Sequence, residues 1–149
     1  MDICVVALGK IGLPLAVQFA QAGHRVRGAD IDPVTVGLIN DGVPPFPGET
    51  GLDEGLRRVR DAGLLDATTD TAEAVAASEV VVVVVPLFVD DQARPDFGPM
   101  DAATRDIARG LKPGTLVSYE TTIPVHTTRD RFGEALASAT GMTDMARGT

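Results

Sequence analysis

Six consecutive valines, Val80–Val85, restrict the fold of this chain more than any other feature of its sequence. A run of identical apolar residues cannot present one apolar and one polar face, so both faces of the strand that it forms must be covered. β-branched side chains also favour strands over helices. Strands covered on both faces are typical of parallel sheets with helices packed on each side. The valine run therefore predicts a central parallel strand in an α/β protein.

The rest of the chain alternates short apolar runs with helical stretches, as such a sheet requires. Further strands are expected at Ile3–Leu8, Arg25–Ala29, Ala67–Thr69 and Thr115–Tyr119. Helices are expected at Ile11–Ala22, from Asp32 to Gly42, at Leu52–Ala62, from Asp70 to Ala77, at Met100–Leu111 and at Thr128–Ala139, with loops at Gly42–Gly51 and Pro86–Pro99. This order predicts βαβ units with right-handed crossovers and a ligand site at the carboxyl ends of the strands. The predicted fold class is α/β, a Rossmann-like doubly wound parallel sheet.

The chain has 149 residues, which suits a single domain with a sizeable core. We expect this domain to occupy residues 1–140, followed by a poorly ordered tail at 141–149. No strand is predicted after the last helix, so the sheet is expected to lack its final strand. Apolar surface on the last strand and helix would then attract a partner, which predicts a homo-oligomer.

Composition excludes several classes of function. The formal net charge of −8 lacks the basic footprint of a nucleic-acid binder. No apolar run approaches the ~18 residues that span a bilayer, and no signal peptide is recognisable, which predicts a cytoplasmic location without membrane association. Cys4, the only cysteine, forms no internal disulfide and lies in an apolar run, where it is expected to be a core residue.

No metal site is predicted. The carboxylates at Asp90, Asp91, Asp96 and Asp101 match the spacing of no calcium loop, and a solvated loop is the favoured interpretation.

The residues that follow the first strand resemble a dinucleotide-binding fingerprint. The segment Ala7-Leu8-Gly9-Lys10-Ile11-Gly12 lies between a predicted strand and a predicted helix. Gly9 would let the backbone approach a pyrophosphate, and Gly12 would let the helix pack tightly on the strand. The helix N-terminus offers free N–H groups to that anion. Ala7 stands where the fingerprint has its first glycine, and alanine is costly there if φ is positive.

An acidic residue at the end of the second strand completes this pattern. Asp30 follows Ala7 by 23 residues, and its carboxylate can accept hydrogen bonds from both ribose hydroxyls while repelling the 2′-phosphate of NADP. NAD is therefore the expected cofactor. Asp32 competes for this role, but we interpret it as the cap of the next helix, whose first residue is Pro33. The alternative for the whole constellation is a βαβ unit with an ordinary tight turn.

Several segments together resemble the UDP-glucose/GDP-mannose dehydrogenase family, and most of all its UDP-N-acetyl-hexosamine branch. The likeness covers about residues 2 to 132. The segments are Leu8–Ala16, Ala29–Asp32, Leu38–Gly42, Glu49–Leu52, Val84–Pro86, Leu111–Val117 and Glu120–Thr128. Each is weak alone, but their order and spacing are specific.

This resemblance implies an NAD-binding portion of a nucleotide-sugar 6-dehydrogenase, which oxidises the C6 alcohol of a UDP-sugar to a carboxylate. Gly9, Lys10, Ile11 and Gly12 would surround the pyrophosphate, and Asp30 would hold the ribose. Val85 and Pro86 would pass close to the adenosine side. Thr122 would lie near the nicotinamide and the reacting carbon, as a cofactor-binding and candidate catalytic residue.

The chain also departs from the family pattern. Thr35 stands where a lysine often contacts the ribose, and Leu87 and Phe88 replace the usual threonine and proline. His126 replaces a glycine, which would strain the turn if φ is positive there.

The family's second oxidation passes through a thiohemiacetal on a cysteine, supported by a lysine, an asparagine and a glutamate, all outside the matched segments. We therefore expect this chain alone to be catalytically incomplete and to meet a nucleotide sugar only with a second domain or chain. Two alternatives stay open: a stand-alone Rossmann binding or regulatory module, and a different NAD-dependent dehydrogenase that obtains its catalytic half from another chain.

Overall fold

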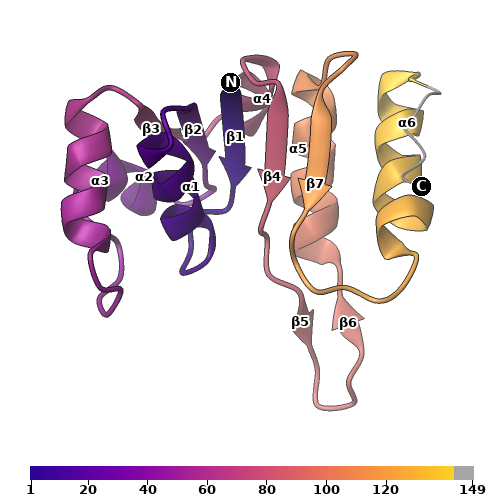
Figure 1. The fold of residues 1–149 in the computed structure, drawn as a ribbon. Helices are drawn as coiled ribbons and strands as arrows, with labels where there is room; N and C mark the ends of the chain where they lie inside the picture. The colour runs from indigo at the N-terminus through magenta and orange to yellow at the C-terminus, as the bar shows by residue number, and fades with distance from the viewer. Residues whose placement is uncertain (143–149) are drawn as a thin grey trace.

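A five-stranded parallel sheet forms the centre of the molecule in the computed structural model, which describes residues 1–142 (Figure 1). The strand order is β3-β2-β1-β4-β7. The strands are β1 (Asp2–Val6), β2 (Arg25–Ala29), β3 (Leu65–Thr68), β4 (Val80–Val83) and β7 (Leu116–Tyr119). The helices are α1 (Gly12–Gln21), α2 (Pro33–Asn40), α3 (Leu52–Asp61), α4 (Thr71–Ala76), α5 (Gly98–Gly110) and α6 (Glu134–Thr140). The prediction of a doubly wound parallel sheet is confirmed.

The valine run forms an interior strand of this sheet through Val80–Val83, as predicted. β4 pairs with β1 on one side and with β7 on the other, both in parallel. Val82 belongs to one core cluster, whereas Val81 and Val83 belong to the other. β1 alternates in the same way, with Val5 on the first face and Cys4 on the second. The sheet therefore has two apolar faces, because consecutive side chains of a strand point in opposite directions.

Different helices cover the two faces. The first cluster packs α1 and α3 against the sheet, through buried residues such as Leu13 and Leu56. The second packs α4, α5 and α6, through Val75, Ile107 and Leu136. This two-sided cover is the arrangement that buries both faces of a parallel sheet.

The segment Pro86–Pro99, which was predicted to be a loop, is a loop only in part. It contains a short antiparallel hairpin, β5 (Phe88–Val89) and β6 (Pro95–Asp96), which projects beyond the carboxyl end of the sheet (Figure 1). The Asp90 carboxylate accepts hydrogen bonds from the N–H groups of Gln92 and Arg94, each at 2.9 Å, and so closes the turn. Two-residue strands held by such a turn leave no periodic pattern in the sequence.

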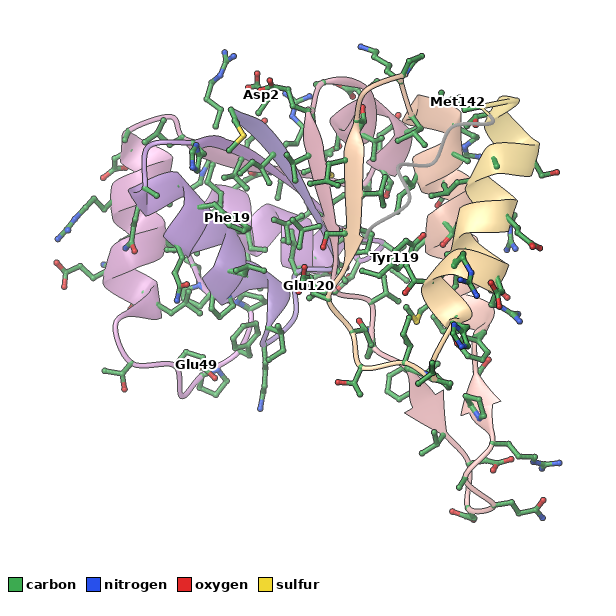
Figure 2. All side chains as sticks on the ribbon, turned by 45° about the vertical axis from the view of Figure 1, so that its right-hand side comes forward. Asp2, Phe19, Glu49, Tyr119, Glu120 and Met142 are labelled. Atoms are coloured by element: carbon green, nitrogen blue, oxygen red, sulfur yellow. The ribbon has the colours of Figure 1, made fainter. Side chains whose placement is uncertain are left out.

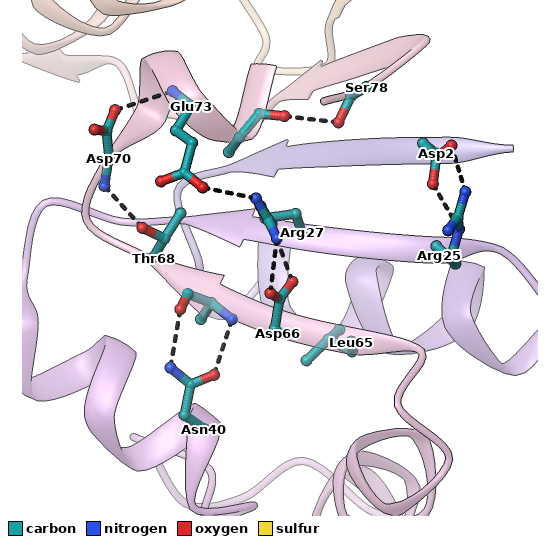
Figure 3. A network of polar contacts seen from close by, with 12 residues as sticks. Asp2, Arg25, Arg27, Asn40, Leu65, Asp66, Thr68, Asp70, Glu73 and Ser78 are labelled. Carbon is teal, nitrogen blue, oxygen red and sulfur yellow. Dashed lines mark hydrogen bonds and ion pairs between the residues drawn. The ribbon is translucent and has the colours of Figure 1, made fainter. Parts of the chain in front are cut away.

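Polar contacts around β2 and β3 fix the sheet edge and the helix ends nearby (Figure 3). The Asn40 side chain forms a pair of 2.9 Å hydrogen bonds with the backbone of Ala67, which ties α2 to β3. Asp70 caps α4 by accepting from the Glu73 N–H at 2.9 Å. The Glu73 carboxylate pairs with Arg27 at 3.2 Å, and the Asp70 N–H donates instead to the Thr68 hydroxyl at 3.0 Å.

The final helix begins with a wider turn than predicted. Thr128–Gly133 forms a π-helical segment (η1) that continues into α6. Phe132 in this segment is fully buried, stacked on Tyr119 with ring centroids 4.6 Å apart and edge-on to Phe97 at 6.2 Å. This aromatic group joins η1 to β7 and α5.

The outer edge of β7 has no strand partner among residues 1–142. Most of the tail predicted at 141–149 lies outside the described residues. No helix in the described part is long and apolar enough to cross a membrane.

Candidate cofactor site

The loops that follow four of the parallel strands lie next to one another at the carboxyl end of the sheet. The strand order places them along this edge in the sequence β2, β1, β4, β7. The chain reverses its direction of winding between β1 and β4, which is where doubly wound sheets bind ligands. Figure 2 shows Glu120 at the carboxyl end of β7 and Glu49 on the loop before α3 near the same edge. Three strand spacings, about 14 Å, separate the outer two loops.

The phosphate loop, residues 7–12, turns sharply between β1 and α1. Ala7 has a φ of 75°, the left-handed conformation that the sequence analysis identified as costly for alanine. Its N–H donates to the Ala29 carbonyl at 2.8 Å. A Cβ on Gly12 would lie 1.8 Å from the Ala7 carbonyl oxygen, so only glycine fits there. Gly12 therefore serves the packing of the helix on the strand, as predicted.

Gly9 has no such structural reason to be glycine. It is exposed, it does not adopt a left-handed φ, and a Cβ built on it would have no heavy atom within 4 Å. The open space lies at the start of α1, which has no side-chain cap and no acidic residue in its first turn. A pyrophosphate fits these features, because the unpaired N–H groups and the helix dipole both favour an anion. Lys10 and Ile11 complete the loop, and both side chains are exposed.

Asp30 follows β2 and contacts the phosphate loop directly. One of its carboxylate oxygens accepts from the Leu8 N–H at 2.8 Å, and the other accepts from the Asp32 N–H at 3.0 Å. Each oxygen can accept a further hydrogen bond, which leaves capacity for ribose hydroxyls. Asp30 is therefore placed both to hold the loop and to bind a sugar.

Asp32 is engaged elsewhere. It caps α2 by accepting from the Val34 N–H at 3.0 Å, and it accepts from the Thr35 hydroxyl at 2.7 Å. These hydrogen bonds, first that from the Thr35 hydroxyl and next that from the Val34 N–H, lower the pKa of Asp32. The interpretation of Asp32 as a helix cap is confirmed, and Thr35 belongs to that cap.

Beyond the place between β1 and β4 where the winding reverses, a side chain joins the loops after β4 and β7. Val85 is buried and Pro86 is exposed. The Thr121 hydroxyl donates to the Val85 carbonyl at 2.6 Å, while the neighbouring Thr122 is exposed at the edge. Thr121 was not among the predicted site residues, because its contact with Val85 joins positions 36 apart and leaves no local signal in the sequence.

His126 also has a left-handed φ, of 71°, so the expected strain at this substituted glycine is present. Its side chain is exposed, and its Nδ1 lies 3.3 Å from Nη2 of Arg129.

A buried thiol and a half-buried phenol near the second face do not titrate in the ordinary range. Burial raises the pKa of the Cys4 thiol to about 12, against a smaller opposing effect of Arg27. Burial also raises the pKa of the Tyr119 phenol to about 12, although the hydrogen bond with Thr104 opposes the shift. Because a thiolate is needed for nucleophilic attack, Cys4 is a core residue, as predicted.

Among residues 1–142, no group of three or more side chains is gathered to bind a metal. Two of the four carboxylates that were predicted to lie in a solvated loop have arginine partners, and one of them, Asp101, lies in the first turn of α5. Asp90 pairs with Arg94 at 2.8 Å, and Asp101 forms a two-pronged pair with Arg131 at 2.6 and 2.8 Å.

Comparison with known proteins identifies the domain. Residues 1–145 match the NAD binding domain of the UDP-glucose/GDP-mannose dehydrogenase family. UDP-N-acetyl-D-mannosamine dehydrogenase of Pyrococcus horikoshii is 38% identical over 144 residues, which cover 95% of this chain and 33% of that protein. NDP-N-acetyl-D-galactosaminuronic acid dehydrogenase of Ralstonia nicotianae is 39% identical over 126 residues, which cover 85% of this chain and 29% of that protein.

The fold agrees with these matches. The solved structure of UDP-D-ManNAc dehydrogenase from Pyrococcus horikoshii aligns with a TM-score of 0.90 and 34% identity, over 97% of this chain and 34% of that one. This chain thus spans about a third of the length of the relatives that it matches.

Proposed function

Because this chain belongs to the UDP-glucose/GDP-mannose dehydrogenase family and forms its NAD-binding domain, we propose that it is the cofactor half of a nucleotide-sugar 6-dehydrogenase. The proposed reaction oxidises the C6 alcohol of a UDP-N-acetylhexosamine to a carboxylate. The relatives that act on N-acetylated nucleotide sugars support this choice of substrate. The alternatives of a binding module or a shared dehydrogenase gain no separate support from the site.

The phosphate loop and Asp30 bind the cofactor in this proposal. Gly9 leaves room for the pyrophosphate at the start of α1, with Lys10, Ile11 and Gly12 around it. Asp30 accepts hydrogen bonds from the ribose hydroxyls of the adenosine, and its negative charge rejects the 2′-phosphate of NADP. The observation that carries the proposal is the placement of the exposed Gly9 at the uncapped start of α1, next to Leu8, whose N–H donates to the Asp30 carboxylate.

The loops after β4 and β7 hold the rest of the cofactor. Val85 and Pro86 pass along the adenosine side, and the exposed Thr122 lies toward the nicotinamide and the reacting carbon. NAD, when bound, accepts the hydride that leaves the sugar carbon. Cys4 takes no part in the second oxidation, because its buried thiol does not ionise near neutral pH. We place that step on residues outside this chain.

The proposal is tested by calorimetric titration with NAD and NADP. We expect the chain to bind NAD and to bind NADP at least about tenfold more weakly, because Asp30 repels the 2′-phosphate. A tenfold difference in Kd corresponds to about 1.4 kcal/mol of binding free energy. The variant Gly9→Ala should weaken NAD binding at least about tenfold while the free energy of unfolding stays within about 0.5 kcal/mol, as for a surface substitution.

Gly37→Ala is the matched control, because Gly37 in α2 also has nothing within 4 Å of its Cβ position yet lies away from the phosphate loop. It should leave NAD affinity unchanged. Failure of the unaltered chain to bind NAD at millimolar concentration contradicts the proposal, and so does normal binding by Gly9→Ala.

We also propose a cytoplasmic location and a homo-oligomer. The single buried, unpaired cysteine supports a reducing compartment. Leu116 on β7 is 61% exposed, and an apolar groove of about 530 Å³ lies between β7 and α6, lined among others by Leu136 and Met142. These features support association through this side of the sheet, and light scattering that finds a monomer at high concentration would refute it.

A further inference from the structure

We propose that Thr121 is a positioning residue that sets the separation between the loop after β4, on the adenosine side of the site, and the loop after β7, which carries Thr122 on the nicotinamide side. Its hydrogen bond to the Val85 carbonyl holds the loop after β7 in place, and it touches neither the cofactor nor the reacting atoms. This inference rests on the proposed function, because it assumes that NAD spans the loops after β4 and β7.

The strands β4 and β7 pair in regular parallel register only up to a point. Val83 lies opposite Tyr119, and the Glu120 N–H donates to the Val83 carbonyl at 3.0 Å. One residue further, the backbone no longer connects the two segments. The next link is the Thr121 hydroxyl, which donates to the Val85 carbonyl at 2.6 Å. A side chain therefore extends the pairing by one step beyond the sheet.

The register of the ladder shows which backbone donor is missing here. Glu120 donates to Val83, so the Thr122 N–H would be the next donor, to the Val85 carbonyl, and the Thr121 hydroxyl makes that contact instead. Among the described residues, the Thr121 hydroxyl is the only donor to the Val85 carbonyl. Because Val85 is buried and Thr122 is exposed, loss of this donor would leave the Val85 carbonyl without a partner and free the loop after β7, rather than that after β4, to shift.

The positions of the neighbours separate this role from direct binding. Thr121 is half-buried and turned toward β4, whereas Thr122 is exposed at the site edge. Val85 and Pro86 belong to the adenosine side, and Thr122 belongs to the nicotinamide side. A ligand that touches only the adenosine side does not sense the separation of the loops, whereas a ligand that spans both sides does. AMP and NAD are such a pair.

Calorimetric titration of each variant with NAD and with AMP tests the inference. Thr121→Val keeps the shape and removes the hydroxyl, so we expect the Kd for NAD to rise about fivefold, as for loss of one hydrogen bond. The Kd for AMP should stay within about twofold. Thr121→Ser keeps a hydroxyl and should preserve both affinities.

Thr115→Val is the matched control, because Thr115 is a half-buried threonine just before β7, at the opposite end of that strand. It should change neither affinity. The ratio of the two Kd values is unaffected by partial unfolding, because an unfolded fraction weakens both ligands equally.

The inference is overturned if Thr121→Val leaves the NAD affinity unchanged, if it weakens NAD and AMP equally, or if Thr115→Val has the same effect. Absence of binding of both ligands by the unaltered chain instead overturns the proposed function itself. The two failures are therefore distinguishable.

Discussion

The phosphate loop after β1 and the loop after β7 each hold one non-glycine residue in the left-handed conformation, but their surroundings differ. Ala7 is half-buried, its N–H is bonded to Ala29, and its carbonyl oxygen lies against Gly12. His126 is exposed, and its carbonyl accepts only a local hydrogen bond, from the Asp130 N–H in η1 at 2.9 Å.

A left-handed φ therefore has different consequences for stability at the two positions. At Ala7, contacts from β2 and α1 hold the strained residue in place, so the strain is part of a rigid loop. At His126, only local contacts oppose relaxation, so the neighbouring backbone can move to relieve strain. Four predictions test this difference, taken from the largest expected effect to the smallest.

The variant Gly12→Ala should have the largest effect. Its Cβ would meet the Ala7 carbonyl oxygen at 1.8 Å, which forces the phosphate loop and α1 apart. We expect a loss of about 3 kcal/mol in the free energy of unfolding, measured by urea denaturation, together with loss of NAD binding. Gly9→Ala is the control that lacks this clash. Unchanged stability of Gly12→Ala would show that the phosphate loop is not rigid and would contradict the difference inferred between the two loops.

The loop after β7 is anchored instead by the aromatic group beneath it, and high pH should weaken that anchor. Tyr119 has its pKa raised to about 12 in the folded chain, against about 10 when unfolded. Because the folded chain keeps the Tyr119 proton more tightly than the unfolded chain does, the raised pKa stabilises the folded chain. This stabilisation is complete below pH 10 and is lost as the pH rises toward 12. The loss is at most about 3 kcal/mol, since each unit of pKa shift corresponds to about 1.4 kcal/mol.

Tyr119 is the only tyrosine, so the phenolate absorbance of the chain reports this group alone. Tyr119→Phe should remove that titration and its share of the pH dependence. Titration of the native chain near pH 10 would contradict the burial of the anchor.

The variant Ala7→Gly should stabilise the protein. Removing the Cβ relieves the left-handed strain, and the gain exceeds the entropy that glycine adds to the unfolded chain. We expect about 0.5–1 kcal/mol, seen as a rise of a few degrees in Tm, with NAD affinity kept within about twofold because the other contacts still hold the loop. A large fall in NAD affinity would mean that the Cβ itself shapes the loop.

The variant His126→Gly should give the smallest gain, about 0.5 kcal/mol or less, since its exposed loop already relaxes. Thermal unfolding of Ala7→Gly and His126→Gly under the same conditions compares the two gains in stability. A gain at His126 larger than that at Ala7 would reverse the comparison.

Much of this arrangement was predictable because its signals are local. The cap at Asp32 depends on a side chain three residues or fewer from its partners, and the valine run depends on side-chain chemistry alone. The hairpin at Phe88–Val89 and Pro95–Asp96 was missed because each strand has two residues and its turn is closed by contacts of Asp90 that have no periodic signature.

The sequence alone predicted the sheet, its two covered faces, the tight turn at residues 7–12 and the place of Asp30 at the end of β2, because periodicity and spacing of neighbours encode them. Only the tertiary structure showed that Asp30 holds the Leu8 N–H, that Gly12 lies against Ala7 and that Thr121 joins the loops after β4 and β7. Each of these contacts except the one at Gly12 joins residues more than twenty positions apart, and all three depend on how strands and helices pack. Distances of this kind are set by the register of the sheet, which no local pattern specifies.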